Sequence, residues 1–543
     1  MGCATSTPQI TSDDKLNNTY KRARLSQNLV QQTNKVDPMT KYEICKQIGI
    51  GSMGCVSTVR AKNNDDDDND TNNPHLYAMK TLRPGRMTRE FIAELKNEIR
   101  SIRRLDHPNI VRFHEVYYTE KQISIIMDYC GGGDLYGRMP YTEAQAAAIM
   151  SQVLTALGYM HLRGYVHLDI KCENIMFTSA APDAPVKVID FGFAQHLGKD
   201  ALAHKQLGTF DTMAPEVFGG NYNTQADVSN RHTNSLVINN TIVGPCFYSQ
   251  FFVSASLDSD HVLIQLWSAG VVAFELISGK KPFAAASAMG VLGKVTNGEI
   301  PMNDKKWKAK SAASKAFVKA LIKRDPKERL DADRALKHKW IRERSTAAAP
   351  VGHARSKSMS TIGDTIIKYG QAPTLKKIGL LMIAHKTFPE EVVKMQQQFA
   401  WFDTKHTGIV TFEDFQKVLH DINQEYSHDD ILQIFQSLDT YENGQIAYTE
   451  FVAAMLEKYV HLTEHRIDDA FDRIDVTNSG YISVDDLRLV LGKDFTDEKA
   501  KEIISQIDFD GDGQGKLRLP QNRRRYFNPG YILTQLHRFC SFA

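Results

Sequence analysis

An internal repeat toward the carboxyl end of the chain restricts its fold more than any other feature of the sequence. Four segments begin with an aspartate that is followed five residues later by a glycine, and successive segments lie 36, 36 and 33 residues apart. Tandem units with such a period are copies of one small structural unit that packs on its neighbours. The four pairs are Asp403 and Gly408, Asp439 and Gly444, Asp475 and Gly480, and Asp508 and Gly513.

The composition is that of an intracellular globular protein with several domains. The 543 residues amount to about three to four domain lengths. The net charge of +2 gives no electrostatic reason to expect a nucleic-acid partner. The seven cysteines form no CxxC pair, so neither a disulfide framework nor a zinc site is indicated. Without an apolar run of about 18 residues, no membrane span is expected. We expect a monomer in the cytoplasm.

The chain divides by composition into an α+β body and a helical tail. Residues 1–40 are polar without periodicity and predict a disordered extension. Short β-like runs such as residues 123–128, followed by helical patterns such as residues 144–162, predict two lobes over residues 41–341. Residues 342–362 are typical of a linker, and Ile366–His385 is basic and apolar, which favours one helix with an apolar face. The expected divisions that follow are a linker and junction at 342–390 and two pairs of repeats at 391–458 and 459–520.

A glycine-rich segment opens a set of motifs that suits phosphoryl transfer. Residues 48–56 match G-x-G-x-x-G-x-V, in which glycines let backbone amides approach nucleotide phosphates. Lys80 follows on the next strand, and Glu98 can pair with it and fix its ammonium on the phosphates. Asp169 and Asn174 stand in His-Leu-Asp-Ile-Lys-Cys-Glu-Asn, which Asp190-Phe191-Gly192 and Ala214-Pro215-Glu216 follow in order.

Residues 42–341 resemble the eukaryotic protein kinase family. The resemblance implies that Asp169 orients the substrate hydroxyl, that Asn174 and Asp190 hold Mg²⁺, and that Lys171 stabilises the transferring phosphoryl group of ATP. Lys171 beside Asp169 is the serine/threonine pattern, and Glu173 is the residue that often meets a basic substrate residue. The resemblance assigns ATP contacts to Ile48, Gly49, Gly51, Gly54, Val56, Lys80, the gatekeeper Met127, the hinge residues Asp128 and Cys130, and Asp134 near the ribose.

Two departures from the kinase pattern leave a second interpretation open. Leu168 replaces the arginine that normally meets a phosphorylated activation loop, so control by such phosphorylation is not expected. Phe210 and Thr212 stand where proline and tyrosine are usual, which affects substrate docking. The alternative to an active enzyme is a catalytically impaired kinase-like scaffold or a calcium-sensing adaptor.

The four repeats resemble EF-hands, whose loop positions 1, 3, 5, 7, 9 and 12 supply oxygen ligands to Ca²⁺. Loop one carries Lys405 at position 3, where an oxygen is needed, and is expected to bind weakly or not at all. Loop two has Tyr441 at position 3, and loop four has Leu519 at position 12. The candidate calcium ligands are Asp439, Asn443, Gln445 and Glu450 in loop two, Asp475, Thr477, Ser479, Tyr481 and Asp486 in loop three, and Asp508, Asp510, Asp512 and Gln514 in loop four.

A kinase domain, a basic junction and four EF-hands in this order resemble the calcium-dependent protein kinases of plants and protists. Gln371–Leu381 looks like the junction of that family. The resemblance implies that the junction occupies the kinase until a calcium-opened lobe captures its apolar face.

Two segments contradict the fold that surrounds them. Without residues 228–265, Ala226-Asp227-Leu266-Trp267 reads as one continuous buried helix of a kinase. The segment begins with Val-Ser, which the intron donor GTAAGT encodes, and ends with Gln, which CAG encodes. We therefore interpret it as a retained intron, with a surface loop as the alternative. Loop four breaks similarly at Gly515-Lys516, so residues 521–543 are interpreted as non-native sequence.

The amino terminus predicts lipid attachment. Met1-Gly2-Cys3-Ala4-Thr5-Ser6 matches M-G-x-x-x-[ST], so Gly2 is a candidate for myristoylation and Cys3 for palmitoylation. Two acyl chains anchor a protein stably, whereas one binds marginally. We expect the kinase on the cytoplasmic face of a membrane.

Overall fold

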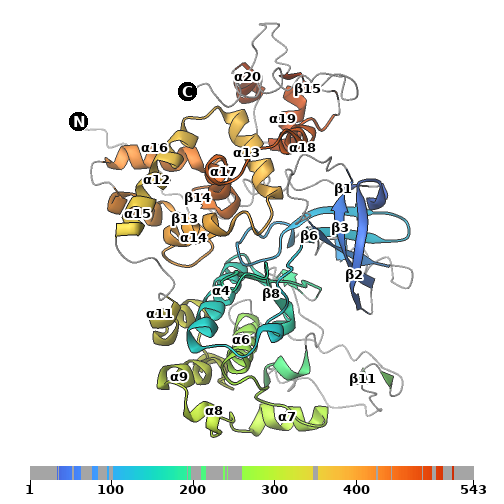
Figure 1. Ribbon diagram of the computed structural model, residues 1–543, viewed down its shortest axis with the longest axis vertical. Coiled ribbons are helices and arrows are strands. Elements are labelled where there is room, and N and C mark those ends of the chain that lie inside the picture. Colours follow the sequence, from blue (N-terminus) through green and yellow to red (C-terminus); the bar gives the residue numbers. More distant parts are fainter. Residues whose placement is uncertain are drawn as a thin grey trace, which may run out of the picture.

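The computed structural model describes most of the two predicted lobes and of the tail. The described residues are 33–34, 36–51, 54–62, 76–83, 95–96, 99, 102–192, 194–196, 209–215, 237–238, 241–242, 260–345, 353–422, 426–441, 443–477, 479, 481–491, 497–505 and 517–518. Figure 1 shows a sheet lobe, a helical lobe below it and a helical tail beside both. The expected α+β plan with an all-helical regulatory region is confirmed.

A six-stranded sheet with the strand order β1-β5-β6-β4-β3-β2 forms the small lobe. Gly54 in β3 shows why the residue type matters, because a Cβ there would lie 1.8 Å from the carbonyl oxygen of Thr81 in the paired strand. The short strand β1 pairs with β5, so part of the extension expected to be disordered is ordered. The strands are β1 (Thr33–Asn34), β2 (Tyr42–Gly51), β3 (Gly54–Ala61), β4 (Tyr77–Leu82), β5 (Phe113–Tyr118) and β6 (Ile123–Asp128).

The large lobe is built around two long helices, α4 (Glu143–Leu162) and α6 (Asp260–Ser278). Thr142 and Gln145 form a capping box that satisfies backbone donors where α4 begins. Gly270 brings α6 close to α9, since a Cβ would lie 2.8 Å from side-chain atoms of both Leu321 and Ile322. The other elements are β7 (Tyr165–Val166), β8 (Ile175–Phe177), β9 (Val186–Val188), β10 (Gln195–His196), β11 (Val237–Ile238), β12 (Thr241–Ile242), α7 (Ala288–Asn297), α8 (Lys305–Lys308), α9 (Ala312–Leu321), α10 (Ala332–Leu336) and α11 (Lys339–Ser345).

Helix α6 includes residues that the sequence interpretation assigned to the insert. Residues 260–265 form its first turns and continue without a break into Leu266 and Trp267. Gln265 is 1% exposed, its Oε1 lies 3.2 Å from Nε2 of His161, and its own Nε2 is buried without a partner. A polar amide of the predicted insert is thus incompletely satisfied inside the core. Ala226 and Asp227 lie outside the described residues, so the predicted interruption of this helix stays a prediction.

The tail contains two junction helices where one was expected. Helix α12 spans His353–Gly370, and α13 spans Thr374–Lys386. The single helix predicted over 366–385 is wrong because Pro373 disfavours a helical conformation in the residue before it. The segment predicted as a linker also overlaps the first half of α12. The remaining elements are α14 (Val393–Phe402), β13 (Ile409–Thr411), α15 (Phe412–Ile422), α16 (His428–Leu438), β14 (Gln445–Ala447), α17 (Tyr448–Tyr459), α18 (Glu464–Ile474), β15 (Tyr481–Ile482), α19 (Val484–Leu491), α20 (Asp497–Ser505) and β16 (Leu517–Arg518).

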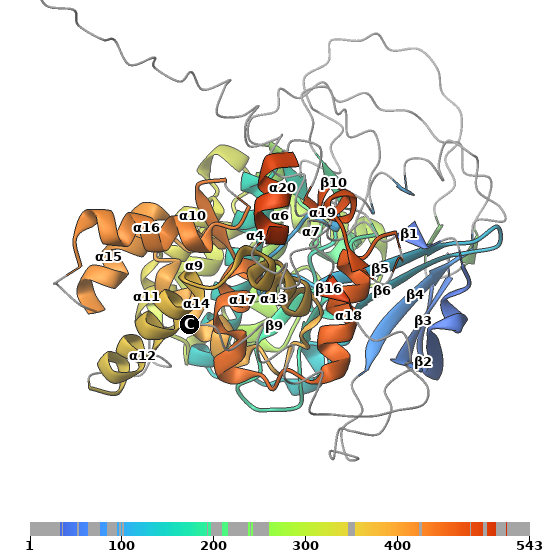
Figure 2. The same ribbon diagram turned by 90° about the horizontal axis from the view of Figure 1, so that it is seen from above.

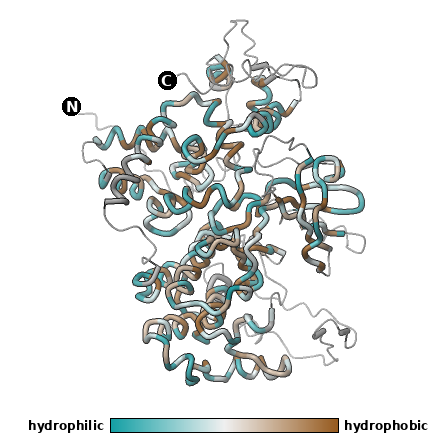
Figure 3. The backbone as a smooth tube through the Cα atoms, viewed as in Figure 1, coloured by the Kyte–Doolittle hydropathy of each residue, from teal (hydrophilic) through white to brown (hydrophobic). Residues whose placement is uncertain are grey.

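Helix α13 lies inside the tail. It packs against α17 and α18, and the views of Figures 1 and 2 agree in placing α13 beside α17. Leu375, Ile378, Leu381 and Ala384 are almost fully buried, and Figure 3 shows hydrophobic segments running through this interior region. The expected single apolar face is thus too narrow a description, because α13 is enclosed on several sides. None of the described helices is long and apolar enough to cross a membrane.

Candidate functional site

The segment between β7 and β8, together with Thr209, brings three polar side chains together around Asp169. The carboxylate of Asp169 is almost fully buried and accepts hydrogen bonds from Asn174 Nδ2 at 2.8 Å and Thr209 Oγ1 at 2.7 Å. Lys171 Nζ lies 2.8 Å from the same carboxylate and 2.8 Å from Thr209 Oγ1. These contacts fix one carboxylate beside one cation, which suits a group that orients a hydroxyl for attack.

His167 holds this loop against the segment that carries Asp190. Its Nε2 lies 2.9 Å from the carbonyl oxygen of Ile189, and its Nδ1 accepts the backbone N–H of Asp169 at 3.3 Å. Burial lowers the pKa of His167, which keeps the ring neutral and able to serve as both donor and acceptor. Leu168, between the two, has φ 66°, a left-handed conformation that is unusual for a leucine.

Lys80 pairs with Asp190 across 2.5 Å. Burial raises the pKa of Asp190, but the charge and hydrogen bond of Lys80 outweigh it and lower the pKa below the usual range. The strand register places Val56 opposite Lys80, and Gly49 opposite Val56. The described glycines of the glycine-rich hairpin, Gly49, Gly51 and Gly54, therefore lie in the sheet next to the lysine strand.

The hinge lies at the end of β6, the last strand of the small lobe. Met127 and Cys130 are mostly buried. Asp128 turns its carboxylate inward, to His114 at 2.8 Å and Lys187 at 3.1 Å, so only its backbone is left to face a nucleotide. Asp134 accepts the backbone N–H of Gly137 at 2.9 Å. Ile48 and Val56 remain partly exposed at the start of the lobe.

Two residues of this site were missed by sequence reasoning. Thr209 bridges Asp169 and Lys171 through its hydroxyl. The only sequence signal for this role is its position five residues before Ala214 of the Ala-Pro-Glu motif. Glu275 of α6 accepts hydrogen bonds from Tyr136 and from Cys172, close to the exposed Glu173. Its signal is an acid within the apolar second half of α6.

Loops two and three of the tail arrange their first and last carboxylates alike. In loop two, Asp439 accepts the N–H groups of Asn443 and Gly444, and Glu450 accepts those of Tyr441 at 2.8 Å and Ala447 at 2.7 Å. In loop three, Asp475 accepts the N–H of Ser479, and Asp486 accepts those of Thr477 and Ser483, each at 2.9 Å. Each loop thus gathers oxygen donors of the kind that Ca²⁺ prefers.

In loop one, the ammonium group of Lys405 lies beside acidic side chains of the same loop. Lys405 Nζ lies 2.8 Å from Glu413 and 3.8 Å from Asp414, the residue at position 12. Asp414 is further occupied by the hydroxyls of Thr404 and Thr411. These residues do not fit a bound Ca²⁺, because an ammonium stands where a ligand would be needed.

Several predicted site residues lie outside the described residues. They are Gly2, Cys3, Glu98, Asp508, Asp510, Asp512 and Gln514. The predicted pair between Lys80 and Glu98 stays a prediction, as do a fourth calcium loop and the lipid attachment.

Comparisons with known protein families match both the kinase lobes and the tail. Residues 42–229 and 256–341, half of the chain, match the model of the protein kinase domain. The tail matches two models of EF-hand domain pairs, one over residues 392–456 and the other over 442–490 and 478–514.

Two calcium-dependent protein kinases and one solved kinase structure are similar to this chain. Calcium-dependent protein kinase 33 of Arabidopsis thaliana is 27% identical over 87% of this chain and 82% of its own length. Calcium-dependent protein kinase 5 of Plasmodium falciparum is 25% identical over 94% of this chain and 83% of its own length. A solved structure, the twitchin kinase region of C. elegans, is 26% identical with a TM-score of 0.44 and covers 57% of this chain and 48% of its own. The chain belongs to the protein kinase family and, within it, to the calcium-dependent protein kinases.

Proposed function

We propose that this chain is a serine/threonine protein kinase that Ca²⁺ activates through its own tail. The observation that carries the proposal is the convergence of Lys171, Thr209 and Asn174 on Asp169. With this geometry Asp169 accepts the proton of a serine or threonine hydroxyl, and Lys171 stabilises the negative charge that develops on the transferred phosphoryl group. The alternative, an impaired scaffold, is less well supported because each of these contacts is in place.

The same site fits ATP and Mg²⁺. The low pKa of Asp190 keeps its carboxylate ionised, as a magnesium ligand requires. Asn174 uses its amide nitrogen for Asp169, so the amide oxygen would be its metal ligand. When bound, the metal neutralises charge on the phosphates. Lys80, the glycine-rich hairpin and the hinge backbone would hold the nucleotide.

Basic protein substrates suit the surroundings of the catalytic loop. Glu173 is exposed beside Asp169, and Glu275 lies close enough to interact with it electrostatically. The exposed carboxylate of Glu173 would attract an arginine or lysine near the phosphorylated residue, whereas the buried Glu275 takes no direct part. We accordingly propose substrates with basic residues close to the target serine or threonine.

Calcium control would act through the enclosure of α13. Lys376 pairs with Glu457 of α17 at 2.8 Å, and Lys377 donates to the carbonyl oxygens of Gly370 and Ser437. A junction helix held in this way cannot also cover the catalytic residues. Loops two and three are the proposed sensors, and the state with α13 inside the tail is the proposed active state.

A radioactive phosphate-transfer assay tests the function. Full-length protein, with and without residues 228–265, is incubated with ATP, Mg²⁺ and a basic serine peptide, in calcium or in a chelator. We expect calcium-dependent incorporation into serine, and none in Asp169→Asn. Equal incorporation in that variant would overturn the assignment of Asp169, and equal activity in the chelator would overturn calcium control.

The insert and the amino terminus add two further proposals. Residues 228–265 are proposed to be a retained intron, which is supported by the incomplete hydrogen bonding of Gln265 and by the gap in the kinase match. Sequencing the transcript across codons 227–267 and 513–520 decides it. We also propose myristoylation of Gly2 and palmitoylation of Cys3 in a monomeric enzyme at the cytoplasmic face of a membrane.

A further inference from the structure

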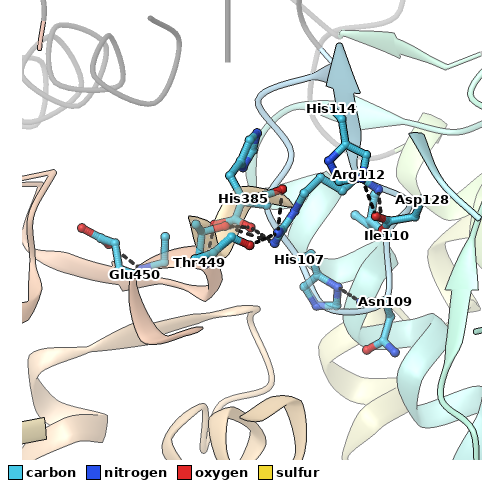
Figure 4. Close-up of polar contacts among 12 residues, drawn as sticks. His107, Asn109, Ile110, Arg112, His114, Asp128, His385, Thr449 and Glu450 are labelled. Atoms are coloured by element: carbon cyan, nitrogen blue, oxygen red, sulfur yellow. Dashed lines mark hydrogen bonds and ion pairs between the residues drawn. The ribbon is translucent and has the colours of Figure 1, made fainter. Parts of the chain in front are cut away.

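Arg112 lies directly behind the hinge of the kinase. Its backbone N–H donates to Asp128 Oδ2 at 3.2 Å, and its carbonyl accepts the N–H of Asp128 at 3.0 Å. Asp128 is the last residue of β6 and the first of the two assigned hinge residues. The main chain of Arg112 is therefore fastened to the segment that joins the two lobes, while its side chain is directed away from it (Figure 4).

The guanidinium of Arg112 reaches the end of α13. Nη1 donates to the carbonyl oxygens of Ala384 at 2.8 Å and His385 at 3.3 Å. The last carbonyls of a helix lack partners within the helix and carry its negative dipole end, so a cation is favourable there. Only 11% of the Arg112 side chain is exposed, which strengthens these charged hydrogen bonds.

Asp106 complements the beginning of α17. Its two carboxylate oxygens accept the backbone N–H and the hydroxyl of Thr449, each at 2.8 Å. Thr449 lies in the first turn of α17, where unpaired N–H groups and the positive dipole end favour an anion. Arg112 Nη2 joins this cluster at 3.2 Å from Asp106 and 3.1 Å from Thr449 Oγ1.

Neighbouring contacts lie on the same face of the kinase. Lys386 is 3.2 Å from Glu115 of β5 and 2.7 Å from Asp469 of α18. Phe388 packs on Tyr77 with ring centroids 5.0 Å apart. In loop one, Gly408 lies so close to the kinase that a Cβ would meet His107 at 2.3 Å, and Ile409 packs on the kinase core.

We propose that Asp106 and Arg112 form a docking site on the kinase that recognises α13 and α17 when they are packed together. Asp106 accepts hydrogen bonds at the beginning of α17, and Arg112 donates hydrogen bonds to the end of α13. Both residues are therefore satisfied only when the two helices are packed together. This inference rests on the proposed calcium switch. Thr449 adjoins Glu450, the position-12 residue of loop two, so a rearrangement of that loop reaches the hinge through Thr449 and Arg112.

Hydrogen–deuterium exchange of the full chain tests the site without relying on kinase activity. We would compare residues 104–117 in calcium and in a chelator. The test variants are Thr449→Val, which keeps the side-chain shape, and Arg112→Gln. The controls are Thr365→Val, whose hydroxyl bonds only within α12, and Arg324→Gln, whose guanidinium donates to carbonyls inside the large lobe.

We expect calcium to slow exchange in this segment in the wild type and in both controls. In Arg112→Gln and Thr449→Val the protection should fall by at least about tenfold, because charged or buried hydrogen bonds are removed. Isothermal titration should still show calcium binding in Arg112→Gln, with an affinity lowered by no more than the docking contributes, because coupling between two sites is reciprocal. Protection retained in Arg112→Gln would overturn the docking site. If wild-type protection does not depend on calcium, the proposed switch fails, and comparing Arg112→Gln with Arg324→Gln still decides the docking.

Discussion

The catalytic site and the calcium loops satisfy their carboxylates in opposite ways. Asp190 is paired with the ammonium of Lys80, which lies 110 residues earlier in the chain, and its pKa is lowered. Glu450 is held by two N–H groups of its own loop, and burial together with the charge of Asp439 raises its pKa well above the usual value. The kinase thus supplies its own cation, whereas loop two provides an electronegative site that a cation would stabilise.

Loop one sharpens this contrast within the tail itself. Its position-12 carboxylate, Asp414, lies near Lys405, so a lysine of the loop supplies positive charge there. The same loop presses Gly408 against the kinase. Loop one is thereby suited to packing, whereas the position-12 carboxylates of loops two and three accept hydrogen bonds from backbone N–H groups.

The largest effect is expected from removing the charge of Asp190. Asp190→Asn keeps the shape but leaves Lys80 without its partner and removes a proposed magnesium ligand. Phosphate transfer should fall by at least about a thousandfold, because charge stabilisation dominates this reaction. Steady-state kinetics measure the loss. Asp183→Asn, on the exposed loop before β9, should match the wild type. A small loss in Asp190→Asn would contradict the role of Asp190 as an ionised magnesium ligand.

A smaller effect is expected at Thr209. Thr209→Val removes the hydroxyl between Asp169 and Lys171 and should lower kcat by about tenfold or more, since positioning hydrogen bonds are lost. Thr209→Ser should recover most of the activity. If serine and valine behave alike in a kcat measurement, the hydroxyl does not position the catalytic pair.

The sequence contains the catalytic motifs because each is a short run with fixed internal spacing. Asp169, Lys171 and Asn174 can be predicted from one octapeptide, and β6 was predicted at its observed bounds. The predicted helix from Ala144 to Leu162 differs from α4 by one residue, because its apolar pattern is long and its amino-terminal cap is local.

The docking contacts could not be predicted in the same way. Arg112 and Thr449 are separated by 337 residues, and neither belongs to a periodic pattern or motif. The break between α12 and α13 does have a local signal in Pro373, which the apolar periodicity across it obscured. Thr209 lies between these cases, since its motif is local but its partners are not.

Loops one and two can be compared directly by removing the charge of the carboxylate at position 12 in each. Glu450→Gln should raise the calcium concentration for half-maximal activation by about tenfold, because a charged ligand is lost from loop two. Asp414→Asn in loop one should change it by less than about twofold, since Lys405 already stands in that loop. Titrating kinase activity with buffered calcium gives both values. Equal shifts in the two variants would remove the distinction between packing and sensing loops.

The smallest effect concerns pH in the absence of calcium. A carboxyl whose pKa is raised on folding binds a proton more tightly in the folded than in the unfolded state. The free energy of unfolding contributed by Glu450 is therefore fully present below the unfolded pKa, near 4.5, and is lost as pH rises through the folded pKa. The pKa of Asp190 is shifted the other way, so its stabilising contribution is lost only when pH falls below its ordinary value of 3.8.

The raised pKa of Glu450 predicts that the free energy of unfolding changes with pH near neutrality through loop two. In chelator, the free energy of unfolding of the wild type in urea should fall by up to about 1.4 kcal/mol between pH 5 and pH 6, and that of Glu450→Gln should not. Far-UV circular dichroism of both proteins measures the difference, and comparing the two cancels the histidines that also titrate in this range. Asp183→Asn should follow the wild type. Parallel curves for the wild type and Glu450→Gln would mean that Glu450 is ionised without calcium, and the contrast between Glu450 and Asp190 would then no longer hold.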